Sequence, residues 1–168
     1  MSKIWVLAAA CLAASAAVGV ATPDSSAAAP VAGKAQPARN GIVKLKSAYG
    51  FEETIARLKA DVANKGIMFF YEIDQAKLGS AAGVKLLPST LLVFGNPPLG
   101  TQFITANPLA GLDWPVRLLV FQDANGQVWT AYTDFDVIAR RHRITNRDAA
   151  FKMASQVIAS ITSAVAAR

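Results

Sequence analysis

Hydrophobic residues recur along the middle of the chain with the period of an α-helix. Phe51, Ile55, Leu58 and Val62 follow one another at steps of four, three and four residues. This spacing places them on one face of a helix. Gly66 comes soon after the last of them and supplies the left-handed residue that commonly ends a helix. The pattern therefore predicts an amphipathic helix that starts near Phe51 and stops before Gly66.

The same period returns at the C-terminal end of the chain. The apolar positions there are Phe151, Ala154, Ile158, Ile161 and Val165. Such a stripe is also found in helices that lie on a membrane surface, but those carry lysine and arginine on the polar face. Here the polar face is rich in serine, so we expect the helix to pack against the domain's own sheet.

Shorter apolar and β-branched segments predict strands. They cover residues 42–46, 67–73, 89–94, 116–121 and 127–132. Residues 42–46 alternate apolar and basic side chains at one end, as an edge strand does. Residues 89–94 are almost continuously apolar, which predicts an interior strand covered on both faces. Asn125-Gly126 separates the last two strands and predicts a hairpin, because both residues tolerate positive φ.

Polar residues and prolines mark short helices between these strands. Asp74 caps one expected helix, and Thr101 caps a helical turn that stops at Pro108. Asp134 and Asn146 can each cap a further helix. Strands and helices thus mix along the chain. The predicted class is α/β, in the α+β two-layer form: a roughly five-stranded mixed sheet with helices packed on it, ending in a hairpin and a C-terminal helix.

The N-terminal part differs from this pattern. Lys3 is followed by an uncharged run rich in Ala, Val and Leu, and small residues precede Ala21. This predicts a cleaved signal peptide over residues 1–21, with a retained membrane helix as the rival interpretation. Residues 22–40 are rich in Pro, Ala and Ser and predict a flexible linker, which leaves residues 41–168 as a single domain. The expected location is the periplasm or the exterior of a bacterium.

Cys11 is the only cysteine in the chain, and it lies inside the apolar run. Three alanines precede it, which suggests a lipoprotein as an alternative. The apolar stretch before Cys11 is very short, however, and the residues after it remain apolar. Cleavage near Ala21 then leaves a mature chain without cysteine, which needs no disulfide in an oxidising compartment.

The chain has 17 Lys+Arg against 11 Asp+Glu, a formal net charge of +6. Much of this excess is local, since Arg140, Arg141, Arg143 and Arg147 lie close together. We interpret the cluster as a solvated helix end, where the helix dipole favours cations. A contact with anionic lipid or an acidic ligand is the alternative. Export argues against nucleic-acid binding, and we expect no stable membrane insertion after cleavage.

The middle of the chain resembles the family known as domain of unknown function 302, from about Ser47 to His142. The residues that carry the resemblance are Phe51, Thr54, Leu58, Gly66, Pro88, Phe94-Gly95-Asn96-Pro97, Gly100-Thr101, Pro108, Pro115, Asp123, Gly126 and Tyr132. The resemblance implies a compact α/β domain of mostly bacterial proteins and no particular activity. Relatives often carry His after the acid that closes the second strand, where this chain has Gln75. A metal or acid–base role built on that His would be lost or altered here.

The turn at residues 95–100 is the best candidate for a binding site. Its glycines have the spacing of a phosphate-binding loop, but Thr101 occupies the position of the essential Lys. Two interpretations remain: a rigid turn that only fixes the strand to the helix, and a pocket for a small anion or a carboxylate formed by the Asn96 amide and a helix that starts at Thr101. Tyr132 and His142 follow the hairpin and are candidates to reach the same end of the sheet. His142 is the only histidine, and beside its arginines it is more typical of a surface residue than of a catalyst.

The inventory of catalytic residues is poor. Without cysteine, a second histidine or a nucleophile elbow, the usual hydrolase constellations are hard to assemble. We therefore expect a non-catalytic module that binds a small ligand or serves as an accessory, with no metal and no cofactor; a homodimer is left open. The alternative is a small cofactor-free enzyme, an isomerase or a hydrolase, that uses polar groups around residues 95–101 with an acid such as Asp74 or Asp123.

Overall fold

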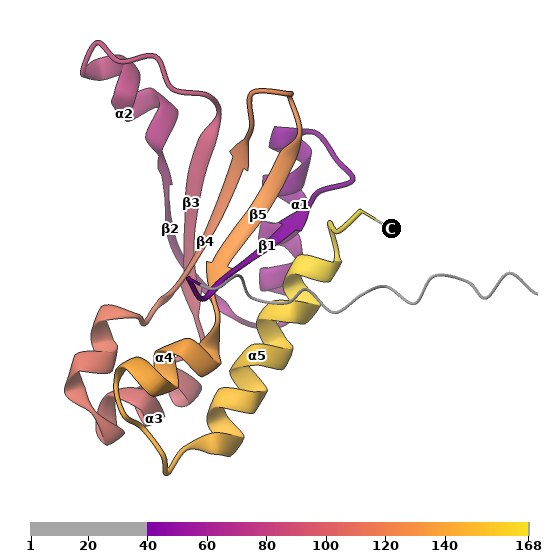
Figure 1. Cartoon of the computed structure of the whole chain (residues 1–168). Helices are drawn as coiled ribbons and strands as arrows, with labels where there is room; N and C mark the ends of the chain where they lie inside the picture. Colours follow the sequence, from indigo (N-terminus) through magenta and orange to yellow (C-terminus); the bar gives the residue numbers. More distant parts are fainter. Residues whose placement is uncertain (1–39, 168) are drawn as a thin grey trace, which may run out of the picture. The chain divides into compact units, whose positions relative to one another are not determined.

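The computed structural model describes residues 40–167. The expected signal peptide, Cys11 and all of the expected linker except Asn40 lie outside the described residues. Strands and helices mix along the described part (Figure 1). The strands are β1 (Ile42–Lys46), β2 (Met68–Asp74), β3 (Ser89–Gly95), β4 (Val116–Gln122) and β5 (Val128–Thr133). The helices are α1 (Phe51–Asn64), α2 (Gln75–Ala81), α3 (Pro97–Ala106), α4 (Phe135–Arg141) and α5 (Asp148–Ser163), with the 3-10 helix η1 (Pro108–Leu112).

The strands form one five-stranded sheet in the order β1-β5-β4-β3-β2. This confirms the predicted α/β class, the strand count and the edge position of the first strand. The sheet is antiparallel at every pairing of the described strands, however, whereas the sequence predicted a mixed sheet. One difference arises at α2, which does not carry the chain back across a sheet face. Instead β2 and β3 pair as the two arms of a long hairpin, and α2 lies at its tip (Figure 1).

The helices α1 and α5 pack against one face of this sheet and against each other. All five residues of the predicted C-terminal stripe are buried, which confirms that α5 belongs to the domain. From the strands, the core receives alternate residues: Val43, Leu92, Phe94, Leu118, Val120, Val128 and Tyr132. The opposite face of the sheet contributes nothing to this core.

Two details of the turns correct the sequence-based predictions. Asp134 caps α4 as expected, since its Oδ1 accepts the Asp136 N–H at 3.2 Å. The residue that precedes α5 is Arg147 instead of Asn146, and no side chain caps that helix. In the hairpin only Gly126 has positive φ, at 78°, because Asp123 accepts the N–H groups of Asn125 and Gln127 and so builds the turn itself.

Candidate functional site

The site begins where β3 leaves the sheet. Asn96 follows the last residue of β3 and adopts an extended conformation, with φ −107° and ψ 106°, as the N-cap of α3. Pro97 and Pro98 form the first turn of that helix, where a proline's missing N–H costs nothing. The helix therefore starts four residues earlier than predicted. Thr101 lies inside it, and its hydroxyl donates to the Pro97 carbonyl oxygen at 2.8 Å.

This geometry removes the basis of the predicted anion pocket. Pro97 and Pro98 have no backbone N–H to offer. The next two donors, the N–H groups of Leu99 and Gly100, both bond to the Asn96 carbonyl oxygen, at 3.1 and 2.9 Å. The N-terminal end of α3 consequently has no free donors in its first turn for a carboxylate. The side-chain amide of Asn96 makes no capping hydrogen bond and is left available.

Trp114 packs directly on the two glycines that flank this turn. A Cβ atom built on Gly100 would lie 2.0 Å from Nε1 and Cε2 of Trp114, and one on Gly95 would lie 3.1 Å from Nε1. Only glycine lets the indole approach the backbone this closely. On its other side the indole meets Phe70 edge to face, with ring centroids 6.2 Å apart. The two glycines therefore leave the space that the Trp114 indole occupies, and this ring forms one wall of the site.

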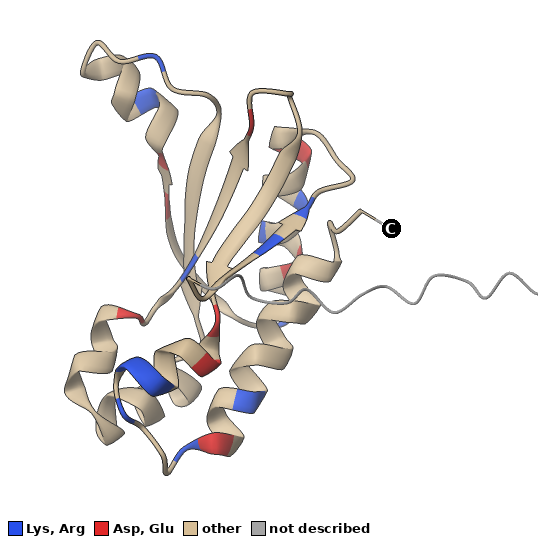
Figure 2. Ribbon diagram, in the orientation of Figure 1, with Lys and Arg blue, Asp and Glu red and all other residues tan. Residues whose placement is uncertain are grey.

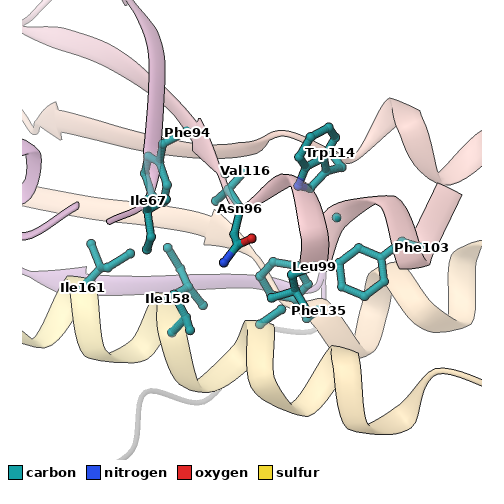
Figure 3. Close-up of a pocket in the computed structure, with 14 residues that line it drawn as sticks. Ile67, Phe94, Asn96, Leu99, Phe103, Trp114, Val116, Phe135, Ile158 and Ile161 are labelled. Atoms are coloured by element: carbon teal, nitrogen blue, oxygen red, sulfur yellow. The ribbon is translucent and has the colours of Figure 1, made fainter. Parts of the chain in front are cut away.

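Beneath this wall lies an apolar cavity, which we call the Trp114 cavity (Figure 3). The space inside it that the centre of a water-sized sphere can occupy is about 30 Å³, within a hollow of about 380 Å³ that is open to solvent. It lies between the end of the sheet, α3 and α5, and Figure 3 shows the Asn96 amide directed into it among apolar side chains. The labelled lining residues are Ile67, Phe94, Asn96, Leu99, Phe103, Trp114, Val116, Phe135, Ile158 and Ile161. None of the described residues that line it has a titratable side chain.

Of the four residues predicted to share a site, only Asn96 lines this cavity. Thr101 is exposed and bonded to its own helix. The Tyr132 ring is buried in the core. His142 is buried as well, whereas its arginine neighbours had suggested a surface residue. The predicted grouping fails because α4 carries His142 toward η1 and away from the turn.

The partner of His142 is Asp113, which precedes Trp114. His142 Nε2 and Asp113 Oδ2 are 2.6 Å apart, and the two side chains are only 6% and 5% exposed. Arg141 Nη1 lies 2.8 Å and 2.9 Å from the two carboxylate oxygens, and Arg117 Nη2 lies 3.3 Å from Oδ1. Burial alone would raise the pKa of Asp113, but the hydrogen bonds from His142 and Arg141 and the charge of Arg141 lower it overall. These contacts therefore fix Asp113, and with it the backbone that leads into Trp114.

The predicted basic cluster thus divides between structural and solvated positions. Arg141 contacts Asp113, while the Arg140 and Arg143 side chains are exposed. Figure 2 shows the basic positions along α4 and the turn that follows it in blue. Asn107 adds a second tie to this region, because its Nδ2 donates to the His142 carbonyl oxygen at 2.8 Å. The ends of α3 and α4 are joined through these contacts, so the segment that carries Trp114 is fixed from both sides.

Tyr132 is held in a different environment. Burial raises the pKa of its phenol above the usual value of 10.0, and the nearby charge of Asp134 raises it further. A protonated phenol at neutral pH is a packing group with a hydroxyl, and it does not act as a base.

Within residues 40–167 no group of three or more His, Cys, Asp and Glu side chains gathers in a way that would hold a metal ion. In the same residues no helix is both long and apolar enough to cross a membrane.

The family model for Domain of unknown function DUF302 matches residues 43–167, so the chain belongs to this family. A solved structure of an uncharacterized conserved DUF302 protein from Bacillus stearothermophilus shares the fold, with a TM-score of 0.68. The two chains are 17% identical, and the similarity covers 74% of this chain and 98% of that one. This confirms the resemblance seen in the sequence.

Curated relatives show a further similarity. The chain is 34% identical over 105 residues to fluoride-specific ion channel FluC 1 of Brucella suis biovar 1 (strain 1330). It is equally similar to FluC 2 of Brucella melitensis biotype 1. The match covers 62% of this chain but only 41% and 39% of those relatives. Most of each relative therefore lies outside the shared stretch.

Proposed function

We propose that this protein is an exported, non-catalytic module that binds a small, neutral, largely apolar ligand in the Trp114 cavity. The observation that carries the proposal is the lining of that cavity, which is apolar and aromatic with one unengaged amide. Ligand sites commonly combine an apolar wall with a few polar groups that fix orientation. Asn96 supplies both a donor and an acceptor here.

The chemistry of the lining separates this proposal from the predicted alternatives. A carboxylate or another anion would need a cation or free N–H groups, and the described lining offers neither. An isomerase or a hydrolase would need an acid or a base beside the substrate, and the one buried Asp–His pair is engaged in its own contacts away from this cavity. Export is supported by the character of residues 1–21.

Asn96→Ala provides a direct test with two probes of similar shape. Indole carries an N–H that can donate to the Asn96 amide oxygen, whereas benzene makes no such bond. Asn96 is exposed in the free protein, so we expect the substitution to weaken indole binding by about 0.5–1.5 kcal/mol, the usual net contribution of one hydrogen bond. Benzene binding should hardly change. Binding is measured by titration of the Trp114 indole signal in NMR spectra.

The stability of the same variant provides the control. Asn96 makes no capping hydrogen bond, so its loss should leave the free energy of unfolding nearly unchanged. A strongly destabilised variant whose folded fraction binds indole as well as the wild type would show that Asn96 only shapes the turn. Equal losses for indole and benzene would show that the amide does not contact the ligand.

A second candidate is an accessory role beside a membrane channel. It is favoured by the curated relatives, in which a sequence like this one makes up about two fifths of a protein named as a fluoride-specific ion channel. The two candidates differ in where the protein is found. An accessory of a channel would be recovered with the membrane fraction, and a free binding module with the exported soluble fraction.

A further inference from the structure

One face of the sheet is largely apolar, with Arg117 as the one charged residue on its three inner strands, and it has no helix packed on it within the described residues. Its residues occupy the strand positions that alternate with the core and stand outside the core cluster. The register aligns Ile73, Leu91, Leu119 and Ala131 in one row across four strands. Phe121 and Trp129 pair in the next row, and Val93 pairs with Tyr71. We call these eight residues the open sheet face.

An antiparallel sheet with one solvated face normally alternates apolar residues inside with polar residues outside. Residues 89–94 break that rule, and their nearly continuous apolar run predicts a strand covered on both faces. The helices α1 and α5 provide only one of these two covers. Among the eight residues Val93 alone is fully buried, at 2% exposure, while Tyr71 is 54% exposed. The composition of the strands therefore requires a second layer that the described chain does not contain.

We propose that a second copy of this chain packs its own open sheet face on this one, so that the protein is a homodimer with a four-layer helix–sheet–sheet–helix core. Two sheets stack face to face about 10 Å apart, with side chains from both interlocking. Such a contact is isologous, because the same patch serves both partners around a two-fold axis. This interface is independent of the ligand proposed for the Trp114 cavity.

The size of the face fits this role. Five strands about 4.8 Å apart and seven residues long at roughly 3.3 Å per residue span on the order of 500 Å². Two such faces bury about 1,000 Å² in total if they are treated as flat, and side chains that project from them add to this area. A buried area of about 1,000 Å² is the lower bound for a specific interface. Three of the eight side chains, Tyr71, Phe121 and Trp129, are aromatic, the type enriched at the centres of interfaces.

Charge favours one orientation of the two copies. The edge strand β1 carries Lys44 and Lys46 on this face, and Lys44 Nζ already lies 3.8 Å from the ring centroid of Trp129. The opposite edge strand β2 contributes Tyr71 to this face and has no lysine or arginine, while its acidic residues alternate onto the helix-covered face. A two-fold axis parallel to the strands sets β1 of one copy over β2 of the other. This brings Tyr71 near the partner's lysines and keeps lysines apart from lysines.

Sedimentation equilibrium of the purified protein over a wide concentration range tests the proposal. We expect a dimer for the wild type. Leu119→Lys places an unpaired charge at the centre of the open sheet face and should raise the dimer dissociation constant by on the order of a hundredfold or more. The matched control is Met153→Lys, because Met153 is an exposed apolar residue on α5 and lies away from this face. It should remain dimeric.

Two substitutions at Tyr71 keep the test decisive even if Leu119→Lys fails to fold. Tyr71 is half exposed, so both Tyr71→Lys and Tyr71→Glu should fold, which circular dichroism checks. In the proposed orientation Tyr71→Lys repels the partner's Lys44 and Lys46 and should weaken the dimer about tenfold more than Tyr71→Glu. A wild type that stays monomeric, with the face left to another part of the chain or to a different protein, overturns the proposal. A dimer equally insensitive to both Tyr71 variants does so too.

Discussion

Replacing Gly100 by alanine is expected to destabilise the protein by about 3 kcal/mol, the upper end of the usual cost of overpacking. The new Cβ would lie 2.0 Å from two indole atoms of Trp114, a contact that real structures do not contain. Because the obstacle is a rigid ring wedged beside Phe70, the indole must leave its position. Overpacking of this kind costs roughly 1–3 kcal/mol and sometimes more. Urea unfolding followed by circular dichroism measures the loss.

The sign of this effect makes the prediction sharp. In the interior of an ordinary helix, glycine to alanine stabilises by about 0.5–1 kcal/mol, since glycine is the poorer helix former. Gly111→Ala is the matched control, because the nearest atom to its new Cβ is 4.0 Å away. We expect that variant to be at least as stable as the wild type. A Gly100→Ala protein as stable as the wild type would mean that Trp114 does not occupy the wall of the cavity.

Replacing Asp113 by asparagine should be similarly damaging. The substitution removes the carboxylate charge that faces Arg141 and Arg117, and it weakens the hydrogen bond to the buried His142 side chain. Loss of hydrogen bonds that involve a charged group costs about 1.5–3 kcal/mol. The control is Asp136→Asn, an exposed residue of α4, for which we expect a change within about 0.5 kcal/mol.

The pH dependence identifies the cause of that loss. The pKa of Asp113 is lower in the folded protein than its usual value of 3.8, so the folded state favours the charged carboxylate. The stabilisation is complete at neutral pH and disappears as the pH falls through the lowered pKa. The gap in unfolding free energy between wild type and Asp113→Asn should therefore be widest at neutral pH, shrink as the pH falls through 3.8, and close only below the lowered pKa of the folded protein. A gap that persists in acid would show that shape, and not charge, holds this cluster.

Local patterns were sufficient to predict most of the fold. The helical steps of Phe51 to Val62 and of Phe151 to Val165 gave the two helices that cover the sheet, because burial of one stripe dominates the energy of such helices. The five strands follow from apolar runs of the right length. Strand direction was harder, since it depends on whether α2 crosses the sheet or only lengthens a hairpin. No local feature of residues 75–82 decides between these two possibilities.

The candidate site was predicted only in part. Asn96 was correctly placed at the end of a buried strand and beside a stiff turn. Thr101 was misplaced because the proline pair before it starts the helix earlier. Trp114 was missed, although its signal was present: two glycines close together at a turn imply something bulky against the backbone. His142 was read as a surface residue because its partner, Asp113, is 29 residues away and cannot be identified from sequence spacing.

The same limit applies to the open sheet face. The apolar run of β3 predicted covers on both sides, and the chain contributes one of them within the described residues. Apolar residues on both faces of a strand indicate that a layer packs on each face. They do not indicate whether the second layer belongs to the same molecule.

The central claim, that the Trp114 cavity binds a small neutral ligand, is tested most directly by native mass spectrometry of the protein purified from its own exported fraction. Three proteins are compared: the wild type, Val157→Phe, which fills the cavity from α5, and Met153→Phe, an exposed control on the same helix. We expect a chain shortened at the N-terminus that carries a small non-covalent adduct in the wild type and in Met153→Phe, and no adduct in Val157→Phe. A folded wild type without any adduct, or an adduct that survives in Val157→Phe, would contradict this claim.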